Sequence, residues 1–399
     1  MKFANKYYER DIEYAFEMNR FFFRILGIWP FARTNSVLFD LIETVSLVSV
    51  CFFLLLCEFM PILLYVFLVL KDMRLRLKVL GNAIFGLVAI IKYGYVLLYK
   101  NQVRNCMLLI DEDWRNVVSS SDRNSMIDRV RIGKRLIVMC AVFVYMSGVG
   151  VRMAMPLAAG KIVTPQNITI RPLPSAAYFV IFDVQCSPAY EIVYCIQFFA
   201  GFVKYTITVA TFGLVTLCVT HFCAQLDILL TLMDNFVNEN QLENLNKKLA
   251  IVVEHQIKTH NFLQLIQNII QYPSLVEVLG STVMVCFAGF YIIMEWEDRN
   301  IIRLCTYSIA LVMFCFNVFI YCYMGEQVVV QGDKVALKAC TLDWYRLPTI
   351  KARALILIIA ISDIPIKLSA GKFIDLSLRT FGNVVKMSVT YLNLLRTVD

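Results

Sequence analysis

Long apolar runs separated by shorter polar segments dominate the pattern of this chain. A helix needs about 20 mostly apolar residues to cross a bilayer, and seven segments meet that requirement. They lie at 38–60, 77–99, 135–157, 190–220, 274–294, 303–324 and 375–398. A further apolar run, 61–70, is too short to cross alone, so we expect it to extend the first helix or to form a turn lying in the membrane. The pattern predicts an all-α, polytopic membrane protein with seven transmembrane helices.

The distribution of basic residues predicts the orientation of these helices. Most of the 38 Lys and Arg residues lie in loops on the side of the N-terminus, with a dense group in segment 100–135. Cytoplasmic loops are enriched in Lys and Arg. We therefore expect a cytoplasmic N-terminus and, because seven is odd, an extracellular C-terminus. Asn167 opens an Asn-Ile-Thr sequon on the expected outer side, where N-linked glycosylation takes place.

Composition supports a membrane protein and excludes other classes. Hydrophobic residues make up 59% of the chain and charged residues 17%, which is more apolar than soluble domains tolerate. An aromatic content of 13% with so few charges excludes intrinsic disorder. The net charge of +8 belongs to loops between apolar runs, so we expect lipid rather than nucleic acid as the partner. The first 35 residues lack the apolar core of a signal peptide, so the first spanning helix is expected to serve as the targeting signal.

Side chains with a pattern typical of catalysis or metal binding are scarce. The 13 Cys include no Cys-x-x-Cys pair, and most of them lie in apolar runs. Cys186, on the expected outer side, is a candidate for an extracellular disulfide. His255 and His260 are five residues apart, a spacing that does not suit a metal site on one helix face. We expect no enzyme activity, no metal and no cofactor.

Two segments between the spans have amphipathic character. Apolar residues recur at helical spacing through 221–273, which predicts that the fourth and fifth helices continue into the cytoplasm. Segment 326–368 is similar until Pro365 and the turn at 369–371 interrupt it. These apolar faces either pack on one another or form a base between subunits. We treat residues 1–399 as one membrane domain in which 221–273 and 326–368 contribute a cytoplasmic anchor region.

An apolar cavity is predicted between the outer halves of the second, third, fourth and sixth spans. Aromatic and aliphatic side chains with a few hydroxyls suit a small apolar ligand. Taken singly, each stripe is more often explained by ordinary packing within the bundle, and periodicity alone does not reveal which faces point inward. The candidate ligand-binding residues, with Gly148 giving room beside them, are Ile84, Val88, Ile91, Tyr145, Val149, Met153, Phe199, Phe202, Tyr205, Thr306, Tyr307 and Ala310.

Several basic residues lie inside the predicted spans. Ionisable side chains in a membrane face water or a partner. Lys386 therefore lines a wet vestibule or pairs with an acid, and the same applies to Lys92, Arg152 and Lys204. The sequence does not identify the acidic partners. These positions mark where we expect the interior of the bundle to be polar.

The last predicted span carries a narrow stripe near its end. On a helical wheel, Thr380, Met387, Tyr391 and Leu394 fall within about 40° of Val398, given 3.6 residues per turn. Several such stripes around a symmetry axis would form an aliphatic ring that closes a pore by dewetting. The ordinary alternative is an apolar face packed against its own bundle, and the wheel alone favours that alternative.

Short motifs give the C-terminal third a recognisable order. They are YCYMGE at 321–326, WY at 344–345, PIKLSAGKF at 365–373, LSLRTF at 376–381 and TYLNLLR at 390–396. The segments LGIWP at 26–30 and HFCAQL at 221–226 fit the same order. In sequence and spacing these motifs resemble the insect odorant receptors.

The resemblance implies a subunit of a ligand-gated, non-selective cation channel, which converts binding of a small volatile odorant into depolarisation. It implies a heterotetramer with obligate odorant co-receptor subunits in the plasma membrane of olfactory sensory neurons. The pore helix would be 370–399, with Leu394 and Val398 at the hydrophobic gate and Tyr391 and Asn393 beside it. The chain lacks the long insertion between helices four and five typical of the co-receptor, so it resembles a tuning subunit.

Two other receptor classes remain as alternatives. Related gustatory channel subunits favour Gln-Phe after the Thr-Tyr stretch, where this chain has Arg396-Thr397. A G-protein-coupled chemoreceptor would have an extracellular N-terminus and a basic signalling motif after its third helix. Here Arg152 and the residues after it fall on the expected outer side. Both alternatives are therefore disfavoured relative to an odorant-gated channel subunit.

Overall fold

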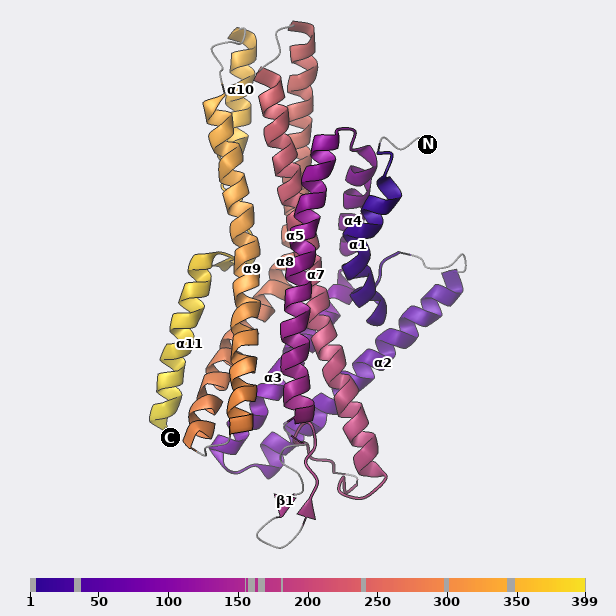
Figure 1. Ribbon diagram of the computed structural model, residues 1–399, viewed down its shortest axis with the longest axis vertical. Coiled ribbons are helices and arrows are strands. Elements are labelled where there is room, and N and C mark those ends of the chain that lie inside the picture. Colours follow the sequence, from indigo (N-terminus) through magenta and orange to yellow (C-terminus); the bar gives the residue numbers. More distant parts are fainter. Residues whose placement is uncertain are drawn as a thin grey trace.

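The computed structural model is an elongated bundle of helices whose longest members run along the main axis (Figure 1). The structure describes residues 5–31, 37–154, 156, 162–163, 169–180, 182–237, 242–297, 301–342 and 349–398. The N-terminus lies beside the upper half of the bundle in Figure 1, and the C-terminus lies near its lower end. Mostly helical structure confirms the expected all-α class.

Elements of the N-terminal half include two π-helical turns and one short hairpin. They are α1 (Tyr8–Ile25), α2 (Val37–Leu64), η1 (Tyr65–Val69), α3 (Met73–Leu98), α4 (Lys100–Asn116), α5 (Ser120–Val149), η2 (Gly150–Ala154), β1 (Ile162–Val163) and β2 (Thr169–Ile170). The C-terminal half contains the longest helices and a second hairpin. Its elements are α7 (Ala189–Val237), α8 (Leu242–Glu297), α9 (Ile301–Thr341), α10 (Thr349–Ser362), β3 (Ser369–Ala370), β4 (Ile374–Asp375) and α11 (Leu378–Val398).

Six of the seven predicted spans coincide with helices that are long and apolar enough to cross a membrane. These are α2 with η1, α3, α5, α7, α8 and α9. The run 61–70 was expected either to extend the first helix or to form a turn in the membrane. It extends the first helix, through the end of α2 and through η1. The seventh segment, 375–398, forms α11, which is not in this group because polar residues interrupt its apolar positions. A crossing by α11 therefore stays a prediction.

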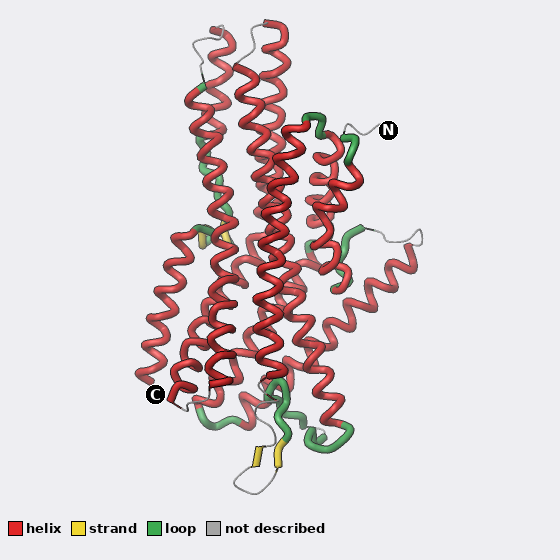
Figure 2. The backbone as a smooth tube through the Cα atoms, viewed as in Figure 1, coloured by secondary structure: helices red, strands yellow, loops and turns green. Residues whose placement is uncertain are grey.

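The helices α7, α8 and α9 continue well beyond the length of a membrane crossing. They have 49, 56 and 41 residues, and Figure 2 shows helix along the whole length of the molecule. This agrees with the amphipathic pattern found through 221–273, since an apolar stripe on each extension packs against its neighbours. The extensions and α10 lie together at the upper end of the bundle (Figure 1).

The helices α1 and α4 were not expected from the apolar runs. Both are amphipathic, with charged residues on one face and buried residues on the other, so a search for apolar segments passes over them. Phe16 and Phe23 of α1 and Met107 and Ile110 of α4 are buried in the main core. The two helices therefore cover the upper half of the bundle rather than crossing it (Figure 1).

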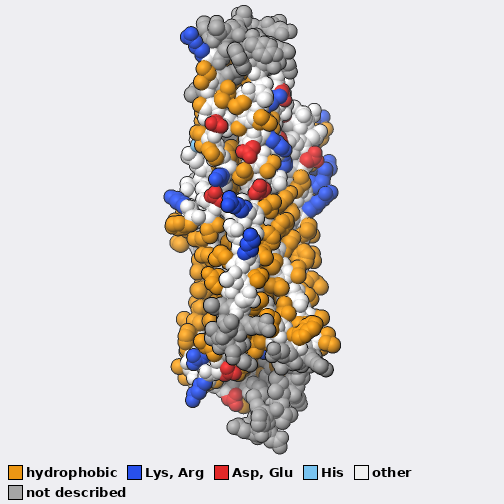
Figure 3. Space-filling view, turned by 90° about the vertical axis from the view of Figure 1, so that its left-hand side faces the viewer, with side chains coloured by type: hydrophobic (Ala, Val, Ile, Leu, Met, Phe, Trp, Pro, Cys, Tyr) orange, Lys and Arg blue, Asp and Glu red, His pale blue; other side chains and the backbone are white. Residues whose placement is uncertain are grey.

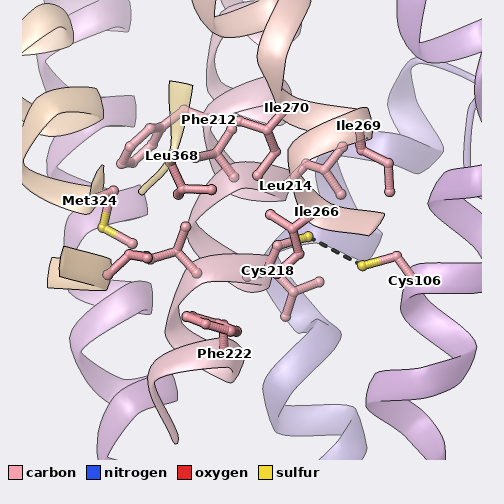
Figure 4. Packing of buried hydrophobic residues seen from close by; sticks show 14 of the residues in the cluster. Cys106, Phe212, Leu214, Cys218, Phe222, Ile266, Ile269, Ile270, Met324 and Leu368 are labelled. Atoms are coloured by element: carbon pink, nitrogen blue, oxygen red, sulfur yellow. Dashed lines mark hydrogen bonds between the residues drawn. The ribbon is translucent and has the colours of Figure 1, made fainter. Parts of the chain in front are cut away.

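Helix α7 occupies the centre of the bundle. Its residues from 205 to 226 are almost all buried, and its apolar window is buried throughout. Figure 4 shows the packing at the level where α7 meets α8, α9 and the segment before β3. The labelled residues are Cys106, Phe212, Leu214, Cys218, Phe222, Ile266, Ile269, Ile270, Met324 and Leu368. The Sγ atoms of Cys106 and Cys218 are 3.5 Å apart, and both thiols are free.

The surface is divided into an apolar zone and a charged zone. In Figure 3 orange side chains cover the lower half of the visible face, while Lys, Arg, Asp and Glu gather above it and at the lower rim. On α2, Leu38, Phe39, Leu41, Ile42 and Val45 are all more than half exposed. Large apolar side chains exposed together in this way are expected to contact lipid, since water would disfavour such a patch.

A short hairpin before α11 holds the start of that helix against α8. The strands β3 and β4 pair antiparallel, and the turn between them contains Gly371 and Lys372 at positive φ. The side chain of Gln267 on α8 bonds both the backbone N–H and the carbonyl of Ser369. The backbone N–H of Gly371 donates to the carbonyl of Gln271 at 2.9 Å. This is the break in helical structure that the turn at 369–371 predicted.

Candidate functional site

A cavity of about 440 Å³ opens near the lower end of the bundle, among α3, α5, α7, α8, α9 and loop residues 172–176. Five aromatic side chains line it: Phe85, Tyr205, Tyr291, Tyr307 and Phe314. Polar lining residues are Lys78, Asn82, Ser147, Ser175, Glu295 and Arg303. A cavity of this size, mostly apolar with a few placed polar groups, suits a small organic molecule.

Three of the predicted ligand-binding residues line this cavity: Tyr205, Tyr307 and Ala310. Thr306 is buried beside them and donates to the carbonyl of Ile302. Near Gly148, the space that a Cβ would fill is taken by the ring of Tyr205, only 2.2 Å from that position. The missing side chain of Gly148 thus gives room to Tyr205 on the cavity wall, as the sequence suggested.

The other predicted residues lie elsewhere in the described structure. Ile84 packs in a cluster around Phe287 and Tyr291, Val88 packs next to Gly280, and Tyr145 hydrogen bonds Thr206. The remaining five point to the outside of the bundle with exposed fractions of 39–56%: Ile91, Val149, Met153, Phe199 and Phe202. None of these eight lines the cavity, and a ligand-binding role for them stays a prediction.

Two parts of the wall were missed by sequence reasoning. Met284, Ala288 and Tyr291 come from α8, which was not among the four helices expected to surround a pocket. Loop residues 172–176 also line the cavity. The backbone N–H and carbonyl of Ser175 form hydrogen bonds with the side chain of Gln197 on α7. The prolines of this loop, Pro172 and Pro174, were a usable signal, because they exclude a long helix there.

A buried ion cluster lies directly behind one wall of the cavity. The carboxylate of Glu58 on α2 accepts from Arg152 at 2.5 Å and from Lys204 at 3.0 Å. The hydroxyl of Ser175 donates to the same oxygen, Oε1, at 3.0 Å. All three charged side chains are at most 4% exposed. Glu58 is therefore the acidic partner that the sequence left unidentified for Arg152 and Lys204.

A second buried pair lies deeper in the bundle. Lys92 on α3 pairs with Glu277 on α8, and both side chains are at most 4% exposed. Ser281 and Asn317 donate to the other oxygen of Glu277, at 3.1 Å and 3.4 Å. The signal for both acids was present in the sequence, since Glu58 and Glu277 are carboxylates inside predicted spans. Their pairing with particular cations depended on the fold.

The far end of the cavity carries its own charged group. Glu295 is almost fully buried, and its Oε1 accepts from Lys78 at 2.9 Å. Its Oε2 lies 3.5 Å from Arg303. These charges join the start of α3 to the ends of α8 and α9 where the loops begin. They close one end of the cavity with polar side chains.

Helix α11 lies along the outside of the bundle (Figure 1). Its buried side chains are Val384 and Ser388, whereas Met387 and Tyr391 are about half exposed. Asn393 and Lys386 are exposed as well. At Met387 and Tyr391, the stripe found on the helical wheel is therefore only partly covered by its own bundle. The side chains of Leu394 and Val398 lie outside the described part of the chain, as does Asn167.

One candidate modification is resolved by the structure. Cys186 is a free, exposed cysteine, and its Sγ lies 3.9 Å from Oδ2 of Asp183. The alternative of a disulfide at this position within the chain is therefore not realised.

Comparison with solved structures identifies the fold. The structure of the insect olfactory receptor OR5 from Machilis hrabei in complex with eugenol superposes with a TM-score of 0.80 over 99% of this chain and 100% of that chain. A second structure of the same receptor gives a TM-score of 0.77. Sequence identity to both is 14%, so these matches establish the shared fold.

Comparison of sequences points the same way. Odorant receptor 67c of Drosophila melanogaster is 26% identical over 46% of this chain and 45% of its own length. Odorant receptor 10 of Aedes albopictus is 21% identical over 61% of this chain and 66% of its own length. Across the curated relatives, the chain spans between 37% and 66% of the relative's length. The model of the 7tm Odorant receptor family matches residues 72–389. Because this match covers most of the chain, including the cavity and most of α11, the protein is a multi-pass membrane protein that belongs to the 7tm odorant receptor family.

Proposed function

We propose that this chain is the odorant-binding subunit of a ligand-gated, non-selective cation channel. It binds a small volatile and assembles with obligate co-receptor subunits as a heterotetramer in the plasma membrane of olfactory sensory neurons. The observation that carries the proposal is the aromatic-lined cavity of about 440 Å³ in a chain of the odorant receptor family. Membership in a receptor family also confirms that the chain is not an enzyme.

The cavity is coupled to α11 through one segment of α8. Met284, Ala288 and Tyr291 line the cavity, and Cys286 and Gly289 between them contact α11. The thiol of Cys286 donates to the carbonyl of Ser388 at 3.6 Å, and Leu392 packs against Gly289. A ligand that binds the open state more tightly shifts α8 and, with it, α11.

The exposed face of α11 supports a role as the pore helix. Met387 and Tyr391 are about half exposed, so part of each side chain is available to face a shared axis. In the proposed channel, residues 370–399 of neighbouring subunits surround the conduit, and Leu394 and Val398 close it by dewetting. Tyr391 and Asn393 lie one turn or less from this gate along the helix.

The gate makes a direct prediction. Leu394→Ser and Val398→Ser are expected to raise the basal current about tenfold, because a polar ring no longer excludes water. Val389→Ser is the matched control, since it makes the same chemical change on the opposite side of the wheel, about 180° from Val398. Whole-cell recording at equal surface expression measures the currents. Basal currents equal to those of the control would contradict the gate.

Channel activity itself is tested by expression with a co-receptor subunit in oocytes under voltage clamp. We expect ligand-evoked cation current for at least one compound of a wide volatile panel. Absence of any evoked current, with surface expression confirmed by labelling, would contradict the proposed function.

The proposed topology has seven crossings, with α11 as the seventh. The N-terminus and the anchor regions 221–273 and 326–368 are then cytoplasmic, and the C-terminus is extracellular. An epitope tag at the N-terminus is expected to stain only after permeabilisation, and a tag at the C-terminus without it. Staining of the N-terminal tag on intact cells would indicate the orientation of a G-protein-coupled receptor instead.

A further inference from the structure

The polar side chains on one wall of the cavity are oriented by cations that lie behind them. Lys204 lies 3.2 Å from Oδ1 of Asn82, and an ammonium group has only donors. The amide oxygen of Asn82 must therefore face Lys204, and its NH2 group points the other way. One of the two N–H bonds donates to Oγ of Ser175 at 2.7 Å. Among the described residues the second N–H bond has no acceptor, so it remains for a molecule in the cavity.

The hydroxyl of Tyr205 is oriented in the same way. Arg152 donates from Nε to the phenolic oxygen of Tyr205 at 3.1 Å, and a guanidinium also has only donors. The oxygen is used as an acceptor, so the phenolic hydrogen is left to donate. Both Asn82 and Tyr205 line the cavity. This wall thus presents donors to a ligand.

The net charge behind the wall is positive, so it also favours an electron-rich ligand atom. Arg152 and Lys204 share one carboxylate, Glu58, and in the described part of the chain neither has a second acidic partner within ion-pair distance. One positive charge is therefore left over in a buried, low-dielectric region. Such a charge is costly unless something of opposite sign approaches it. An electron-rich ligand atom beside Asn82 and Tyr205 would lower that cost.

We propose that the cavity selects volatiles carrying a carbonyl-type oxygen, which accepts hydrogen bonds from Asn82 and Tyr205. Ketones, aldehydes, esters and carboxylates share this oxygen. The apolar remainder of the ligand packs against Phe85, Met313 and Phe314 on the other walls. This inference rests on the proposed function, because it names the ligand class of the same cavity.

Two ligand series with constant skeletons test the class. The aromatic series is acetophenone, methyl benzoate, benzoate, benzylamine and ethylbenzene, and the aliphatic series is 2-heptanone, heptanoate, heptylamine and heptane. In at least one series, we expect the neutral carbonyl compounds to evoke half-maximal current at concentrations about tenfold below those of the hydrocarbon and the amine, since one or two hydrogen bonds are at stake. The carboxylate arms show whether a full negative charge improves on a neutral carbonyl.

The outcomes separate this inference from the proposed function. Equal potency of the amine or hydrocarbon, or silence of both series while other volatiles evoke current, overturns the ligand class and leaves the channel function intact. Silence of every volatile at confirmed surface expression overturns the proposed function as well.

Substitutions on the wall provide the second test. Tyr205→Phe removes the donor and is expected to raise the half-maximal concentration for the carbonyl ligands about tenfold, but for the hydrocarbon less than about twofold. Tyr321→Phe makes the same change at a buried tyrosine that does not line the cavity. It should leave unchanged the ratio of the half-maximal concentration for the carbonyl ligand to that for the hydrocarbon. Lys204→Met leaves an Arg152–Glu58 pair with no excess charge, and the amide of Asn82 is no longer oriented by Lys204. We therefore expect it, like Tyr205→Phe, to raise the half-maximal concentration for the carbonyl ligands more than for the hydrocarbon. A carbonyl-to-hydrocarbon ratio unchanged in whichever of these two variants reaches the surface overturns the inference.

Discussion

Replacing Lys92 with methionine is expected to destabilise the folded protein by about 3–5 kcal/mol, the usual cost of removing one partner of a buried ion pair. Glu277 would keep its charge in the centre of the bundle, and in the described structure only Ser281 and Asn317 would still donate to it. Because the pair joins α3 to α8, its loss also loosens the bundle between the cavity and the upper helices. We expect little or no protein at the cell surface.

Thermal unfolding of detergent-purified protein, followed by size-exclusion chromatography, measures this effect. The double variant Lys92→Met with Glu277→Leu removes both charges and is expected to recover most of the lost stability. Lys367→Met is the matched control, because it breaks an ion pair with Asp375 in which both side chains are more than half exposed. That control is expected to change stability by less than about 1 kcal/mol. Equal melting temperatures for Lys92→Met and the control would contradict the prediction.

The second large effect is expected for Gly325→Ala in α9. A Cβ at Gly325 would lie 2.1 Å from the carbonyl oxygen of Leu376 and 2.8 Å from its carbonyl carbon. These are backbone atoms just before α11, and the backbone N–H of Leu376 is already held by the carbonyl of Leu368 at 2.8 Å. The segment therefore has to move away from α9. We expect a loss of about 3 kcal/mol, the upper end of the range for over-packing, and an evoked current reduced more than tenfold.

Gly382→Ala provides the matched control for this variant. Gly382 lies within α11, and a Cβ there would meet nothing within 4 Å in the described structure. The same substitution should therefore be neutral or raise stability by up to about 1 kcal/mol through helix propensity. Melting temperature and evoked current are measured for both variants at equal surface expression. A Gly325→Ala protein that melts and gates like Gly382→Ala would show that α11 does not depend on this contact.

The role of Gly325 also explains one of the motifs by which the family was suspected. The fifth residue of the YCYMGE motif at 321–326 is Gly325, against which the Leu376 backbone packs. The next residue, Glu326, accepts from the backbone N–H of Leu378 at the start of α11. The motif therefore forms the surface of α9 on which α11 begins. A contact between two backbones requires glycine, whereas most other positions of α9 accept many side chains.

The sequence by itself determined the class of protein and the positions of most helices. Apolar runs of sufficient length have no alternative to helical structure in a membrane, because every backbone polar group must be satisfied within the segment. This reasoning placed the six candidate spans and the break at 369–371. It passed over α1 and α4, whose amphipathic pattern is weaker evidence than a long apolar run.

Only the tertiary structure decided which faces of these helices meet. Helical spacing shows that Phe199 and Phe202 share a side, but both point out of the bundle, whereas Tyr205 on the same helix reaches the cavity. The pairing of Glu58 with Arg152 and Lys204 joins residues more than 90 positions apart. Periodicity describes one helix at a time, while a cavity and an ion cluster depend on how several helices are rotated against one another. That rotation results from side-chain packing across the whole bundle.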